Sequence, residues 1–191
     1  MSLSIVAICN RALDLLGADP ITSLADDSKA ARLCQRNYEG VRDTVLRAYP
    51  WNSAMCRALL PALATVPMFG YRFQYQLPTG PEPAACLRVY QVIAGDDYRI
   101  EGRRLLTDYP PPLQLLYIGQ VLDPNQFDPL LAEAISARLS IYLAGNLTES
   151  ASRIETMRSH YREVLQEARA MDAQEGRADM IEADEWLHSR R

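Results

Sequence analysis

The sequence predicts an α+β fold that is mainly α: a four-helix bundle, a small antiparallel β-module inserted between two helix pairs, and a C-terminal arm. Near both ends of the chain, apolar residues recur at spacings of three and four, which is typical of helices packed on one side. Between these regions the pattern alternates with a period of two, which is typical of half-buried strands. We therefore expect a helical bundle formed by 1–50 and 120–176, a β-module at 51–119 and a docking arm at 177–191.

The composition is that of a globular protein. The chain has 191 residues, of which 48% are hydrophobic and 23% are charged. A chain of this length buries about two thirds of its unfolded surface, so it needs no metal or disulfide to fold. No stretch approaches about 18 consecutive apolar residues and no signal peptide is visible, so we expect no contact with a membrane.

Two helices are expected before the β-module. The first covers residues 4–16, where apolar residues recur at helical spacing. The second begins near Asp26 or Asp27, either of which can cap it, and it ends before Pro50. Trp51 follows at once, and we expect its side chain to pack under the bundle.

Five strands are expected in the β-module, with a hairpin turn at 95–97. They cover residues 71–77, 87–93, 98–100, 104–107 and 113–118. The region from 51 to 119 carries six arginines against five carboxylates. A hairpin that grips phosphates needs a larger basic surplus, so a structural or protein-contact role is favoured.

The last two helices have recognisable ends. Asp128 is expected to cap the third, whose buried face includes Tyr142. Thr148 or Ser152 caps the fourth, and Ser152 with Glu155 fits a capping box. The fourth helix is polar except for one apolar stripe, so we expect it to pack on one side only.

No motif of nucleotide binding, nucleophilic hydrolysis or zinc catalysis is present. Only two histidines occur, and the four cysteines lie far apart, so we expect buried thiols. The predicted catalytic, cofactor-binding and metal-binding residues are therefore none. Glu101 and Asp108 are candidate carboxylates for a glycosidase, although the sequence does not place them together.

An aromatic anchor marks the polar arm. Trp186 and Leu187 follow four carboxylates, and Arg190 and Arg191 follow them. Burying a Trp and a Leu stabilises by about 4 kcal/mol, less than the cost of ordering fifteen residues. We therefore expect Trp186 and Leu187 to dock on a partner, where Arg190 and Arg191 meet carboxylates. Packing back on its own domain, or disorder, stays open as the alternative.

The order of several short segments resembles a family. These segments are Asn10 with Leu13 to Leu16 and Gly17, Pro20-Ile21-Thr22-Ser23-Leu24, Phe69-Gly70-Tyr71, Gln76-Leu77-Pro78, Tyr98-Arg99-Ile100-Glu101-Gly102, Leu106-Thr107-Asp108, Asp128-Pro129-Leu130 and the final Trp-Leu-x-x-Arg-Arg. Together they resemble the head-to-tail connector, or adaptor, proteins of tailed bacteriophages, called tail tubular protein A in short-tailed phages. The resemblance covers nearly the whole chain, and its order carries more weight than any single segment.

The resemblance implies a structural virion protein without catalytic residues. Such proteins form a ring, usually dodecameric, between the portal protein and the tail tube or nozzle protein. Double-stranded DNA passes through the lumen without specific binding. The subunit is made in the host cytoplasm and resides in the neck of the virion. A terminal arm that reaches the portal or a neighbouring subunit would correspond to Trp186, Leu187, Arg190 and Arg191.

Two other classes stay open from the residues alone. One is a tail-associated enzyme that degrades cell wall or polysaccharide, for which Glu101 and Asp108 would be the carboxylates. The other is a bacterial assembly protein unrelated to phage. A substrate assay beside an electron micrograph of the purified chain separates the first from a connector, and neighbouring portal and capsid genes separate the second.

Overall fold

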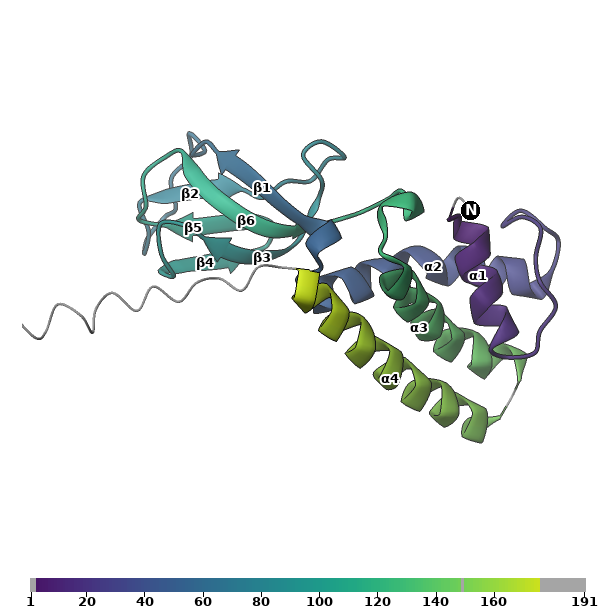
Figure 1. Ribbon diagram of the computed structural model, residues 1–191. Coiled ribbons are helices and arrows are strands. Elements are labelled where there is room, and N and C mark those ends of the chain that lie inside the picture. The colour runs from purple at the N-terminus through teal and green to yellow at the C-terminus, as the bar shows by residue number, and fades with distance from the viewer. Residues whose placement is uncertain (1–2, 149, 176–191) are drawn as a thin grey trace, which may run out of the picture.

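The computed structural model describes residues 3–148 and 150–175, which form a mixed α+β fold (Figure 1). About 46% of these residues are helical and about 20% are in strands. The helices are α1 (Ile5–Asp14), α2 (Lys29–Ala48), α3 (Pro129–Leu147) and α4 (Ala151–Glu175). The strands are β1 (Met55–Leu60), β2 (Phe73–Gln76), β3 (Cys86–Val92), β4 (Tyr98–Glu101), β5 (Arg104–Thr107) and β6 (Leu113–Gly119).

The prediction of a mainly α four-helix bundle with a small β-module is wrong. The helices are arranged around α3, which contacts α1, α2 and α4, whereas α1 and α2 make few contacts with each other. The physical reason is that α3 is buried around most of its circumference, at Ala132 and Ala134 as well as at Leu131 and Ile135. Tyr142, expected in the buried face, is 43% exposed.

The strands form a two-sheet unit with its own core. One sheet has the order β1-β6-β3 and the other the order β2-β5-β4, and every pairing is antiparallel. The two sheets pack face to face, since Leu60, Val92 and Leu115 of the first share one apolar cluster with Tyr75 and Leu105 of the second. The unit therefore buries apolar surface independently of the helical core.

Two predicted helix caps are wrong. Ser28, not Asp26 or Asp27, caps α2, because its hydroxyl accepts a hydrogen bond from the backbone N–H of Ala31 at 3.0 Å. At the start of α4 the hydroxyl of Ser150 accepts from the N–H of Arg153, so no capping box begins at Ser152. The predicted cap of α3 is confirmed: Asp128 accepts from the N–H of Leu130 at 2.8 Å.

The end of α4 is held beside the start of β1 (Figure 1). The carboxylate of Asp172 accepts a hydrogen bond from the N–H of Asn52 at 3.0 Å, and its backbone carbonyl accepts from the Asn52 amide at 2.7 Å. Next to them Trp51 is buried, as predicted, and its Nε1 donates to the carbonyl of Val45 at 3.0 Å. The bonds of Asp172 hold the last turns of α4 against the segment that leads into β1.

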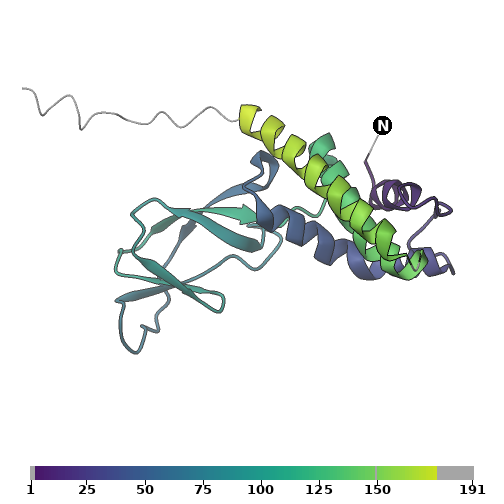
Figure 2. The same cartoon turned by 90° about the horizontal axis from the view of Figure 1, so that it is seen from below.

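Further contacts join α2 to the strands. The amide of Gln120 donates to the carboxylate of Asp43 at 2.8 Å, and the guanidinium of Arg47 donates to the carbonyl of Leu87. Ile118 of β6 packs in the helical core. Seen from below in Figure 2, α4 and β6 lie on one side of the molecule, while the loop between β1 and β2 projects on the other side.

The cysteine prediction is confirmed for three of the four thiols. Cys9, Cys34 and Cys86 are buried, whereas Cys56 is half-buried, and all four are free. The thiol of Cys34 beside Cys9, together with burial, raises the pKa of Cys9 far above its ordinary value. Within the described ranges, no helix is both long and apolar enough to cross a bilayer.

Candidate functional site

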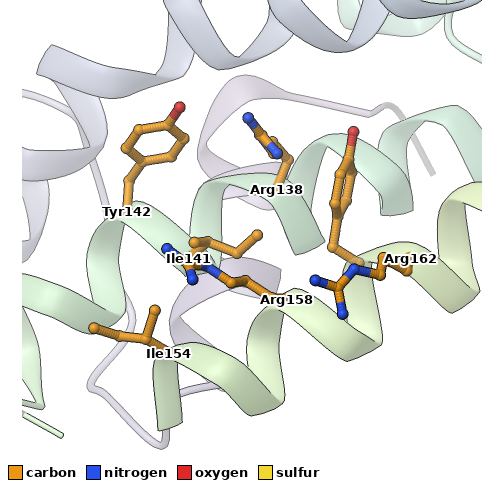
Figure 3. A pocket seen from close by; sticks show the side chains of 7 residues that line it. Arg138, Ile141, Tyr142, Ile154, Arg158 and Arg162 are labelled. Atoms are coloured by element: carbon orange, nitrogen blue, oxygen red, sulfur yellow. The ribbon is translucent and has the colours of Figure 1, made fainter. Parts of the chain in front are cut away.

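A groove with three arginines runs between α3 and α4 (Figure 3). Its volume is about 640 Å³. Its lining, which we call the arginine groove, consists of Arg138, Ile141, Tyr142, Ile154, Arg158, Tyr161 and Arg162. The combination of cationic heads with aromatic and aliphatic walls is suited to an anionic ligand that also carries apolar groups.

Helical spacing explains why these side chains meet. Arg138 and Tyr142 are four residues apart on α3, so they lie on the same face of the helix. Ile154, Arg158 and Arg162 follow the same spacing on α4. Because α3 and α4 pack along each other, the two faces form the two walls of one groove.

Arg138 contacts both tyrosine rings of the groove. Its guanidinium carbon is 5.1 Å from the ring centre of Tyr161 and 5.8 Å from that of Tyr142, within the range of cation–π contacts. Its Nε is buried and has no hydrogen-bond partner among the described residues. Burial raises the pKa of Tyr161, and the charges of Arg138 and Arg169 oppose that rise. Among the described residues no carboxylate pairs with Arg138, whose charge lies between the two tyrosine rings.

The other two arginines share one carboxylate. Arg158 and Arg162 lie 3.5 Å and 3.7 Å from the Glu155 oxygens. All three side chains are more than half exposed, and exposed ion pairs of this kind contribute about 0–1 kcal/mol. A carboxylate from another molecule can therefore replace Glu155 at little cost.

The loop between β1 and β2 carries a second surface, which is apolar. Val66 is 65% exposed, Met68 98% and Phe69 87%. The loop covers part of the outer face of the β2-β5-β4 sheet, where the Gln74 amide donates to the carbonyl of Thr65 at 2.5 Å. We call Val66, Met68 and Phe69 the apolar loop tip.

The apolar loop tip borders a charged groove of about 870 Å³ that contains both glycosidase candidates. Glu101 and Asp108 lie at opposite ends of it, because Glu101 pairs with Arg104 and Asp108 follows four residues later along that strand direction. Four residues of strand span roughly 14 Å, whereas paired glycosidase carboxylates are about 5–9.5 Å apart. Asp108 also accepts a hydrogen bond from the N–H of Arg72 at 2.7 Å. The arrangement does not suit a two-carboxylate hydrolase.

A third surface lies on the outer face of the β1-β6-β3 sheet. Leu59 is 66% exposed and Ile93 is 48% exposed. With Leu116 and Arg57 they line a shallow depression of about 420 Å³. This depression and the apolar loop tip belong to different sheets, so the β-unit presents two separate apolar surfaces.

The predicted partner-binding residues Trp186, Leu187, Arg190 and Arg191 lie outside the described residues. The sequence predicts a fourth helix that is polar except for one apolar stripe, and this pattern does not reveal the arginine groove. The spacing of four between Ile154, Arg158 and Arg162 was the available signal.

Across 3–148 and 150–175, no three His, Cys, Asp or Glu side chains gather closely enough to hold a metal ion. In comparisons with protein-family models and with curated proteins, no match to this chain is found.

Proposed function

We propose that this chain is a structural subunit of a phage neck: an adaptor ring that joins the portal to the tail and forms part of the DNA conduit. The proposal starts from the order of segments that resembles the head-to-tail connectors. It needs no catalytic centre in the chain. It does need several surfaces by which one subunit contacts its neighbours, the portal and the tail.

One observation carries the proposal: the apolar side chains exposed at separate places on the β-unit. Met68 and Phe69 at the loop tip are almost fully exposed, and Leu59 and Ile93 are exposed on the other sheet. Large exposed apolar groups that cluster mark sites of association rather than ordinary surface. Two different surfaces on one subunit are what a head-to-tail contact between copies requires, and such contacts give a ring when the rotation between copies closes.

The charge of the chain supports the DNA conduit. The net charge is -4, with 20 basic and 24 acidic residues. A lumen through which DNA moves should make few phosphate contacts, because each one adds salt-dependent affinity and opposes movement. A mildly acidic subunit meets this requirement better than a basic one.

Electron microscopy of the purified chain with its portal protein tests the proposal. We expect a ring of subunits seated on one end of the portal, and we expect loss of that ring with Met68→Ser/Phe69→Ser. The matched control is Leu122→Ser/Met171→Ser, which also removes two exposed apolar side chains, 52% and 47% exposed, but away from the apolar loop tip. A chain that never joins the portal would refute the proposal, and digestion of cell wall or polysaccharide by the chain would favour the enzyme class instead.

A further inference from the structure

We propose that the arginine groove binds the acidic segment 179–187 of a second copy of this chain. The cationic and aromatic lining of the groove is complementary to the acidic and apolar residues of this segment. The proposal adds a specific contact between neighbouring subunits to the ring proposed above. It rests on that proposed function only in requiring that copies of the chain contact one another.

The segment is complementary to the groove in charge. It contains four carboxylates, those of Asp179, Glu182, Asp184 and Glu185. The groove offers three guanidinium groups, and among the described residues only Glu155 pairs with any of them. Guanidinium and carboxylate groups form charge-assisted and often bidentate hydrogen bonds, which align a peptide as well as attract it.

The segment also matches the groove in apolar character. It holds two apolar pairs, Met180-Ile181 between carboxylates and Trp186-Leu187 after them. The groove provides aromatic and aliphatic walls, and Arg138 lies between the rings of Tyr142 and Tyr161. An indole added to this stack would give Arg138 a third aromatic contact beside those of Tyr142 and Tyr161.

The position of the groove favours a second copy over the same chain. Arg162 lies thirteen residues before the end of α4, a distance of about 20 Å along the helix. The end of α4 is held against Asn52 through Asp172, so a segment of the same chain would have to reverse its direction there and run back along α4. A neighbouring copy can place the segment in the groove without that reversal. Repetition around a ring then adds the single contacts together.

Sedimentation velocity of full-length chains over a concentration series tests the proposal. The wild-type chain should associate as its concentration rises. Arg158→Glu/Arg162→Glu and, separately, Asp184→Arg/Glu185→Arg should each weaken that association at least tenfold, because like charges then face each other. All four substitutions in one chain should restore it. Arg11→Glu/Arg36→Glu, which changes the charge equally on exposed positions of α1 and α2, is the matched control and should associate like the wild type.

A mixture of the two defective variants identifies the occupant. The charge-reversed segment of one variant is complementary to the charge-reversed groove of the other, so an equimolar mixture should associate through pairs between the two variants, although neither variant associates alone. A wild-type chain that stays monomeric throughout the series overturns the proposal, as does a four-substitution chain that fails to associate. Loss of DNA binding in the groove variant, with association unchanged, would assign the groove to phosphates and overturn it too. If the portal ring forms while these variants have no effect, the inference fails and the proposed function stands.

Discussion

At the scale of single residues, Trp51 lies in the helical core, where the chain passes from α2 to β1. It is 1% exposed, its ring meets that of Tyr49 edge-on at 5.0 Å, and its Nε1 donates to the carbonyl of Val45. Trp51→Ala leaves a cavity and an unpaired carbonyl, so it should lower the free energy of unfolding by about 3–5 kcal/mol. Urea denaturation measures this. Met68→Ser, at a 98% exposed position, should change it by less than about 0.5 kcal/mol.

Gly119 is required by close packing at the end of β6. A Cβ there would lie 2.6 Å from the Cys56 sulfur and 3.1 Å from the Ala84 Cβ. Gly119→Ala should therefore destabilise the chain by about 1–3 kcal/mol in thermal or urea unfolding.

Gly40 supplies the matched control for that substitution. It lies inside α2, and a Cβ there would meet nothing within 4 Å. Gly40→Ala should stabilise the chain by about 0.5–1 kcal/mol, because alanine loses less backbone entropy in a helix. Equal effects of the two substitutions would contradict the packing argument.

The residue scale also shows where sequence reasoning stops. Asp26, Asp27 and Ser28 are all good capping residues, so composition alone cannot choose among them. The choice depends on the turn before the helix, where Asp26 binds the N–H groups of Thr22 and Ser23 and is no longer free to cap. Such a turn is a three-dimensional arrangement that single-residue preferences do not encode.

At the scale of elements, the start of α2 gives a direct test of the corrected cap. Ser28→Ala removes the hydroxyl that accepts from Ala31, so it should destabilise the chain by about 1 kcal/mol. Asp27→Ala, one residue earlier, removes an almost fully exposed side chain and should have an effect below about 0.5 kcal/mol. Urea denaturation of both variants measures the difference. A larger loss of stability in Asp27→Ala than in Ser28→Ala would indicate that Asp27 caps the helix.

The turn before α2 should respond to acid. Hydrogen bonds from the backbone N–H groups of Ser23 and Thr22 lower the pKa of Asp26 below its ordinary value of 3.8. A group whose pKa is lowered by folding stabilises above its unfolded pKa, and this contribution is lost as the pH falls through the folded pKa. The difference in melting temperature between the wild type and Asp26→Ala should therefore be present at pH 7 and should shrink below about pH 3.8. A difference that grows in acid would contradict this assignment.

Strand β1 and the burial of α3 on several sides are not predicted, because no pattern in the local sequence indicates them. Periodicity identified five of the six strands, but β1, Met55–Leu60, has little alternation and only one fully buried residue, Leu60. It becomes a strand because it pairs with β6 along its whole length. Likewise α3 was expected to bury one stripe, and its burial on several sides comes from its central place among three helices.

At the scale of the whole molecule, the sequence predicts most of the helices and strands. It does not predict that the β-region forms two sheets with an apolar core of their own. The β-region was expected to be a small insertion, whereas its two sheets build a separate apolar core. Face-to-face packing of sheets joins residues such as Tyr75 and Leu113 that are far apart in the chain, and periodicity along the chain does not report it. The arginine groove was missed for the same reason, since its two walls come from different helices.

The overall charge gives the last prediction, which concerns DNA. With a net charge of -4, the chain should bind double-stranded DNA without sequence preference and more weakly than about 1 μM at physiological salt. Affinity should fall further as salt is added, because the few phosphate contacts act through counterion release. Fluorescence anisotropy with two duplexes of different sequence at 50 and 200 mM salt measures both effects. The groove variant Arg158→Glu/Arg162→Glu should bind as weakly as the wild type, since the groove is assigned to a peptide. A sequence-specific footprint, or submicromolar affinity that survives added salt, would mean that the subunit holds DNA rather than lets it pass.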